Sequence, residues 1–389
     1  MKYTNYFNIL SSIFSGKFTP KVELMKSIIK DIKPFRSISI MVNSVCNLNC
    51  WHCDIPEKYK PGGRMLSVNQ WIEVIRKLDE RLNPALVAVS AREPLMPGAT
   101  RKKTVKIIQI SKELGKIAGI VTNGTYLKNA LSEFVSSDIV LDYLDVSLEG
   151  PKAIDRKIRG RGHFDKVMAA INDDRLMKIT DKFFISFTLN AHNCPIHVMR
   201  EFIEWMLDTF DEARLAVLVL YPNVNVPEEL WLTDEQFLRA LELLLSVSHK
   251  FADIFIDVFP GSIPGLRDII ETGYLPGDDE LIRDKTGMLW GYIDENLYVR
   301  YENLRDLTRY QIRVTPEGKL IMPRDLEKED YRCHAKFAVM SDRLEEMLNK
   351  VLKEVDALDR QVNPLCAGQR CLPTCMGDNF RCSFLRRKQ

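Results

Sequence analysis

Short apolar runs alternate with amphipathic segments over residues 37–222, and this alternation predicts the fold. The runs have the length of β-strands, whereas the segments between them repeat apolar residues every three or four positions, as helices do. The expected strands are Ser37–Val42, Ala85–Ser90, Ile117–Thr122, Leu141–Ser147, Phe183–Asn190 and Arg214–Tyr221. The expected helices are Val68–Leu82, Lys102–Leu114, Lys128–Val135, Phe164–Ile171 and Ile196–Thr209. Strand–helix alternation predicts βαβ units and a parallel sheet.

Six such repeats predict an α/β fold of the partial (β/α)6 type, an open TIM-like barrel. Functional side chains of these barrels lie at the carboxyl ends of the strands. The residues that directly follow each expected strand are therefore the candidates for a site.

The flanking regions suggest three further units. Residues 1–36 contain an expected helix, Lys21–Ile32, and form an N-terminal extension. Residues 223–306 hold a leucine-rich helix, Thr233–Val247, and a strand, Ile254–Val258, and are interpreted as a bridge. Residues 307–389 open with a hairpin signal around Pro316 and Gly318, contain an expected helix, Asp342–Val355, and end in a cysteine-rich tail.

Composition excludes several classes of protein. The 389 residues are 46% hydrophobic and 28% charged, with a net charge of +2, which gives no reason to expect nucleic-acid or membrane binding. The first residues do not resemble a secretory signal. The nine cysteines cluster towards both ends, with Cys194 alone between them, which favours metal binding over a disulfide framework. We therefore expect a cytoplasmic protein in a reducing, oxygen-poor setting.

The densest group of soft ligands directly follows the first strand. Cys46, Cys50 and Cys53 lie within eight residues, and thiolates are the usual protein ligands of iron–sulfur clusters. Three thiolates without a fourth leave one iron of a four-iron cluster open to another ligand. The residues alone also allow zinc with a distant histidine, or three buried thiols.

The next strands are followed by further polar motifs. Glu93 and Pro94 follow the second strand, and Thr122-Asn123-Gly124, interpreted as a plain turn, follows the third. The fourth strand runs into Asp145-Val-Ser147-Leu-Glu149-Gly150, with Arg159 beyond it. Together with the Cys-x3-Cys-x2-Cys loop, these motifs resemble those of the radical S-adenosylmethionine (radical SAM) family.

The resemblance implies a cofactor set and a role for each matched residue. Cys46, Cys50 and Cys53 would bind a four-iron, four-sulfur (4Fe–4S) cluster that binds S-adenosyl-L-methionine (SAM). Glu93 would hold the SAM amino group, Ser147 the ribose and Arg159 the carboxylate, although Arg159 could instead lie in a solvated loop. Two glycines usual before Glu93 are replaced by Ala91 and Arg92, which restricts φ there.

The carboxyl-terminal region resembles the SPASM/twitch appendage of the same family. One expected cysteine position is occupied by Pro323, so a single auxiliary 4Fe–4S cluster is expected. Its candidate ligands are Cys333, Cys366, Cys371, Cys375 and Cys382. A zinc site on four of these residues, or His334 in place of one thiolate, remains an alternative.

The resemblance implies reductive cleavage of SAM to a 5′-deoxyadenosyl radical that abstracts hydrogen from a substrate. We expect a peptide or protein side chain that undergoes oxidative modification or cross-linking, and an electron donor such as flavodoxin or ferredoxin. A dehydrogenase or epimerase acting on a small molecule such as an aminosugar is the alternative, and a non-enzymatic Fe–S or zinc-binding protein is a third class. SAM cleavage after reduction separates the enzymes from the binding protein.

Overall fold

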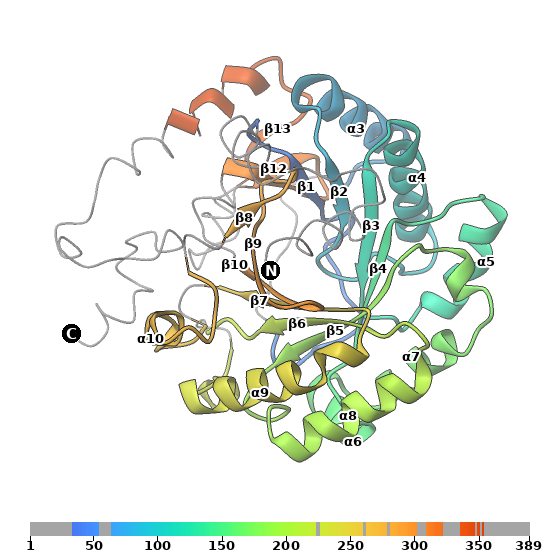
Figure 1. The fold of residues 1–389 in the computed structure, drawn as a ribbon. Helices are drawn as coiled ribbons and strands as arrows, with labels where there is room; N and C mark the ends of the chain where they lie inside the picture. Colours follow the sequence, from blue (N-terminus) through green and yellow to red (C-terminus); the bar gives the residue numbers. More distant parts are fainter. Residues whose placement is uncertain are drawn as a thin grey trace.

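The chain folds into a mixed α/β sheet that curls into a half barrel (Figure 1). The computed structural model describes residues 33–53, 64–222, 226–259, 262–277, 281–301, 309–321, 335–346, 348–350 and 352–353. The expected helix Lys21–Ile32 lies outside these residues, and the expected helix Asp342–Val355 lies partly outside them. The predicted partial barrel is confirmed.

Seven neighbouring parallel strands form the centre of the sheet. They are β1 (Ser37–Ile40), β2 (Leu86–Val89), β3 (Ile117–Thr122), β4 (Tyr143–Ser147), β5 (Phe183–Leu189), β6 (Arg214–Val219) and β7 (Asp253–Val258). The first six strands each lie within the range that the apolar pattern predicts. β7 comes from the region interpreted as a bridge.

Helices cover the outer side of the curled sheet (Figure 1). They are α3 (Val68–Leu82), α4 (Ala99–Glu113), α5 (Leu127–Ser136), α6 (Lys152–Arg159), α7 (His163–Ile171), α8 (Ile196–Thr209), α9 (Asp234–Val247) and α10 (Leu266–Glu271), with short 3-10 turns at Leu176–Lys178, Glu228–Leu230 and Ser248–Lys250. α3 and α8 have the predicted bounds. α6, which is mostly charged, was not expected.

Local sequence explains where the outer helices begin and which face they bury. Ser67 accepts a hydrogen bond from Gln70 N, and the Gln70 side chain accepts one from Ser67 N, a capping box that fixes the start of α3. The apolar face of α3 places Trp71 and Leu78 fully inside the core. α9 begins with the same device, formed by Thr233 and Gln236.

Strands from the later chain extend the sheet at both edges. They are β8 (Ile282–Arg283), β9 (Leu289–Asp294), β10 (Leu297–Tyr301), β11 (Gln311–Val314), β12 (Lys319–Ile321) and β13 (Ala335–Ala338). β10 pairs in parallel with β7, and β11 pairs in parallel with β1 on the side opposite β2. β11 and β12 form the predicted hairpin. Strands from both sides of position 222 thus belong to one sheet, and the domain boundaries remain a prediction.

Candidate functional site

The cysteine loop lies at the carboxyl end of β1. Cys46, Cys50 and Cys53 are half-buried, and none of the three is in a disulfide. Trp51 N donates to Ile158 O of α6 at 2.8 Å, and Cys53 N donates to Cys50 O at 3.0 Å. The first bond holds the loop against α6, which carries Arg159, and the second closes a turn within the loop.

The donor set of this loop fits a four-iron cluster. Among the described residues, no three His, Cys, Asp or Glu side chains are grouped so as to hold one metal ion. A cluster makes a different demand, because each thiolate binds its own iron and the sulfurs lie farther apart than around one tetrahedral metal. Burial raises the pKa of Cys50 to about 11, so iron must displace a proton from this thiol.

Glu93 joins the ends of β2 and β3. Its carboxylate is fully buried and accepts hydrogen bonds from Leu95 N (2.8 Å), Thr122 Oγ1 (2.7 Å) and Asn123 N (2.9 Å). Burial raises its pKa to about 7, although the three donors oppose that shift. Three donors leave room for about one more on the two oxygens, so the predicted contact with the SAM amino group stays a prediction.

The two residues that replace the expected glycines keep a backbone shape typical of glycine. Ala91 has φ +62° and Arg92 has φ +52°, both in the left-handed region. L-residues adopt this region at a cost of about 1–2 kcal/mol. The segment before Glu93 therefore retains a glycine-like path although it contains no glycine.

Ser147 ends β4 with its side chain half-buried, opposite Ser186 of β5. Its hydroxyl makes no hydrogen bond to another described residue, so it is available for a ligand. Asp145 lies two residues earlier on the same strand and therefore on the same face. Burial raises the pKa of Asp145 to about 7 against the opposing charge of Arg300.

Arg159 forms a buried ion pair at the carboxyl end of α6. Its Nε and Nη2 donate to Glu149 Oε1 at 2.8 and 2.5 Å, and its Nη1 donates to Cys50 Sγ at 3.8 Å. Burial lowers the arginine pKa, but the Glu149 carboxylate outweighs it and the pKa lies above its usual value. The alternative of a solvated loop is wrong. Binding of the SAM carboxylate by Arg159 stays a prediction.

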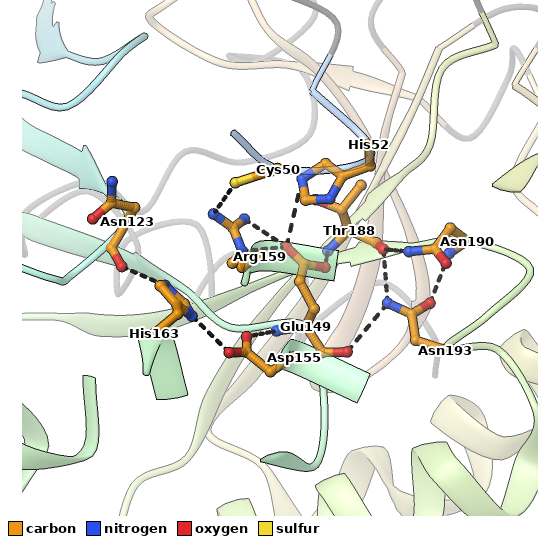
Figure 2. A network of polar contacts seen from close by, with 10 residues as sticks. All are labelled: Cys50, His52, Asn123, Glu149, Asp155, Arg159, His163, Thr188, Asn190 and Asn193. Atoms are coloured by element: carbon orange, nitrogen blue, oxygen red, sulfur yellow. Dashed lines mark hydrogen bonds and ion pairs between the residues drawn. The ribbon is translucent and has the colours of Figure 1, made fainter. Parts of the chain in front are cut away.

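A network of polar residues that sequence reasoning did not assign lies behind this pair (Figure 2). His163 contacts Asp155 and Asn123 at 2.7 Å each, and Asp155 Oδ1 accepts from Glu149 N at 3.1 Å. On the other side, Glu149 Oε2 accepts from Thr188 N at 3.0 Å. Asp155 and Arg159 are four residues apart in one helix, so they lie on the same helix face, and this spacing is the signal that the sequence offers for the network.

Asn123 does more than form the predicted turn. Gly124 has φ +76°, as a turn there requires. The Asn123 side chain also donates to Cys46 Sγ at 3.6 Å and to Asn47 Oδ1 at 3.0 Å. The motif Thr122-Asn123-Gly124 thus connects β3 to the cysteine loop.

The remaining cysteines are divided between a packed position and the tail. Cys194 is buried and donates to Ala191 O at 3.6 Å, in agreement with a packed role. The candidate auxiliary ligands Cys333, Cys366, Cys371, Cys375 and Cys382, and His334, lie outside the described residues. Among the helices that the structure describes, none has the length and apolarity required to cross a bilayer.

Comparison with known proteins shows which family the sequence of the barrel resembles. Residues 40–193 match the family model described as the Radical SAM superfamily. PqqA peptide cyclase from Rhodopseudomonas palustris is 27% identical over 177 residues, which are 44% of this chain and 43% of the relative. The chain thus spans less than half the length of the curated relatives that it matches.

Solved structures share the fold over most of the chain. Streptococcus suis SuiB bound to S-adenosylmethionine gives a TM-score of 0.61 at 12% identity, covering 91% of this chain and 76% of that one. SuiB bound to the precursor peptide SuiA gives a TM-score of 0.58 at 12% identity, and the match covers 94% of this chain and 73% of that one. Residues 40–193 are thus similar in sequence to the radical SAM superfamily, and the curled α/β sheet that contains them has the fold of these solved structures.

Proposed function

We propose that this protein cleaves SAM reductively and abstracts a hydrogen atom from a peptide or protein side chain, which then undergoes oxidative modification or cross-linking. The observation that carries the proposal is the loop with three cysteines at the carboxyl end of β1, in which Cys46 accepts a hydrogen bond from Asn123 and Cys50 accepts one from Arg159. The similarity to the radical SAM superfamily supports the reaction type.

Cys46, Cys50 and Cys53 would hold the 4Fe–4S cluster, and the loop fixes their spacing. The bound cluster would supply the electron for cleavage of a carbon–sulfur bond of SAM, which would yield methionine and the 5′-deoxyadenosyl radical. Ser147 would donate to or accept from the ribose, since its hydroxyl has no other described partner. Arg159 would offer to the SAM carboxylate the N–H of Nη1 that does not face Cys50, because Nε and Nη2 are already bonded to Glu149.

Two relatives support a peptide as the substrate. One is named PqqA peptide cyclase, and the SuiB structure contains a precursor peptide. Neither shares more than 27% of its sequence with this chain in the matched region, so the substrate class is part of the proposal. The proposal also includes a flavodoxin or ferredoxin as electron donor, one auxiliary 4Fe–4S cluster in the tail and a cytoplasmic location.

The decisive experiment measures iron, sulfide and 5′-deoxyadenosine in anaerobically reconstituted protein. Wild type is compared with a Cys46/Cys50/Cys53→Ala variant and with Cys194→Ala, which removes a buried thiol outside the loop. We expect about eight irons in wild type and four in the triple variant, and 5′-deoxyadenosine from wild type and Cys194→Ala only. Four irons in wild type and none in the triple variant would remove the auxiliary cluster from the proposal.

Substrate class is tested by the same product. A pool of synthetic peptides should raise the yield of 5′-deoxyadenosine and give modified peptides with altered mass, whereas aminosugars should not. If aminosugars alone raise the yield of 5′-deoxyadenosine, the substrate is a small molecule and not a peptide. A reduced, cluster-loaded protein that forms no 5′-deoxyadenosine with any substrate would contradict the proposed reaction.

A further inference from the structure

Two side-chain N–H groups point at sulfurs of the cysteine loop. Asn123 Nδ2 lies 3.6 Å from Cys46 Sγ, and Arg159 Nη1 lies 3.8 Å from Cys50 Sγ. The amide orientation of Asn123 follows from its neighbours. Thr125 N is a donor and lies 2.9 Å from Asn123 Oδ1, so the amide nitrogen must face Cys46.

Both donors are held from behind by one unbroken chain of polar contacts (Figure 2). The main-chain carbonyl of Asn123 contacts His163 Nε2 at 2.7 Å, and His163 Nδ1 contacts Asp155 Oδ2 at 2.7 Å. Asp155 Oδ1 accepts from Glu149 N, and Glu149 Oε1 accepts from Arg159. The path therefore leads from Cys46 to Cys50 through side-chain and main-chain groups of the residues that follow β3 and β4 and of α6 and α7.

The centre of this chain can be assigned its protons from geometry. A carbonyl oxygen can only accept, so His163 Nε2 carries a hydrogen that it donates to Asn123 O. Nδ1 and the Asp155 carboxylate then share one proton, because the two atoms are 2.7 Å apart and both side chains are 0% exposed. A satisfied pair in such a site is rigid, since each partner would be costly to leave unpaired.

We propose that Asn123 and Arg159 raise the reduction potential of the cluster, and that His163, paired with Asp155, is the positioning residue that holds Asn123 in place. This inference rests on the proposed function, because it requires the cluster. Reduction adds one negative charge to the cluster, and N–H donors at its thiolate sulfurs stabilise the reduced form more than the oxidised form. Neither Asn123 nor His163 would bind iron.

The test is a redox titration, monitored by electron paramagnetic resonance, of the anaerobically reconstituted protein without SAM or substrate. Asn123→Leu removes the donor at similar volume. Thr125→Val is the matched control, because it removes a hydroxyl from the same group of contacts and leaves the Asn123 donor. The Cys46/Cys50/Cys53→Ala variant supplies the signal of any auxiliary cluster for subtraction.

At a fixed potential near the wild-type midpoint, Asn123→Leu should lower the ratio of reduced to oxidised cluster about tenfold, which is 59 mV for a one-electron couple. Thr125→Val should stay within about twofold of wild type. His163→Leu should shift the ratio in the same direction as Asn123→Leu, and His163→Gln, whose amide can donate to Asn123 O, should restore it. A purely structural role for His163 would lower iron content without shifting the ratio.

The inference is overturned if Asn123→Leu loads the same iron as wild type and keeps its ratio. If His163→Leu fails to load iron, the comparison of Asn123→Leu with Thr125→Val still tests whether Asn123 raises the reduction potential. A wild-type protein that binds no iron would overturn the proposed function instead, so the two failures are distinguishable.

Discussion

Glu149 and Arg159 form an ion pair that is almost completely withdrawn from solvent, with Arg159 8% exposed and Glu149 0% exposed. Its shortest contact is 2.5 Å, and the second carboxylate oxygen of Glu149 accepts from Thr188 N. Such a pair is costly to desolvate, and removal of one partner leaves a buried charge without compensation. This ion pair therefore makes the site sensitive to single changes.

Glu149→Gln should lower the free energy of unfolding by about 3–5 kcal/mol, because the guanidinium of Arg159 stays charged in a buried site. The measurement is urea unfolding of the cluster-free protein. Asp165→Asn is the control, since it breaks the exposed ion pair between Lys152 and Asp165, whose contact is also 2.5 Å, and should cost about 1 kcal/mol or less. Equal losses in both variants would contradict this explanation.

Asp145 should make stability fall as the pH rises from about 4 to 7. Its folded pKa of about 7 lies above the ordinary value of 3.8, so the folded state binds an extra proton in that window. The stability from protonated Asp145 is fully present below about pH 3.8 and is lost as the pH rises through 7.

Asp145→Asn should flatten the slope of unfolding free energy against pH by up to about 1.4 kcal/mol per pH unit within that window. The exposed Asp165→Asn variant controls for the loss of one carboxylate. Parallel curves for wild type and Asp145→Asn between pH 4 and 7 would show that burial does not perturb this carboxyl group.

Ala91→Gly should stabilise the protein by about 1 kcal/mol, because glycine removes the cost of the left-handed backbone at φ +62°. Thermal and urea unfolding would measure the gain. Ala118→Gly in β3, a buried site with ordinary backbone, should destabilise instead. A loss of stability in Ala91→Gly would mean that the Ala91 methyl group contributes more than the strain costs.

Gly124→Ala should destabilise the protein by more than Gly98→Ala. Both glycines have positive φ, +76° and +82°, so both variants carry the backbone cost. A Cβ on Gly124 would also lie 2.8 Å from Val146 Cγ1, whereas one on Gly98 would meet nothing within 4 Å. Overpacking typically costs about 1–3 kcal/mol, and the difference between the two unfolding free energies measures it. Equal costs would mean that Val146 moves aside freely.

Ser147→Ala should weaken SAM binding roughly two- to tenfold, the loss of one neutral hydrogen bond. Calorimetric titration of SAM into cluster-loaded, unreduced protein measures it. Ser136→Ala, at an exposed site on α5, should leave the affinity unchanged. An unchanged affinity in Ser147→Ala would remove the ribose contact from the proposed site.

The parts of the fold that sequence reasoning predicted are those in which local pattern and burial agree. The strand β3 and the helices α3 and α8 have their predicted bounds because an apolar run marks β3, apolar periodicity marks both helices, and a capping box fixes the start of α3. The charged helix α6 has few apolar positions, and its buried face is made of Asp155, Ile158 and Arg159, so no periodic signal marked it.

Some of the site residues can be predicted from the sequence and others cannot. The spacing of the cysteines is visible in the sequence, and so is the position of Ser147 at the end of a strand. The contact of His163 with Asn123 joins residues 40 positions apart, and it exists only because the fold brings the start of α7 to the carboxyl end of β3. The side chains that complete a buried network are chosen by that packing, which no local pattern encodes.

The pairing of β11 with β1 has a consequence for the order in which the protein is made. β1 carries the cysteine loop, yet one of its two neighbours, Gln311–Val314, is translated more than 270 residues later. Until that segment leaves the ribosome, β1 is the edge strand of an incomplete sheet, with unpaired backbone groups next to the cysteine loop. The surroundings of the cysteine loop are therefore completed only at a late stage of synthesis.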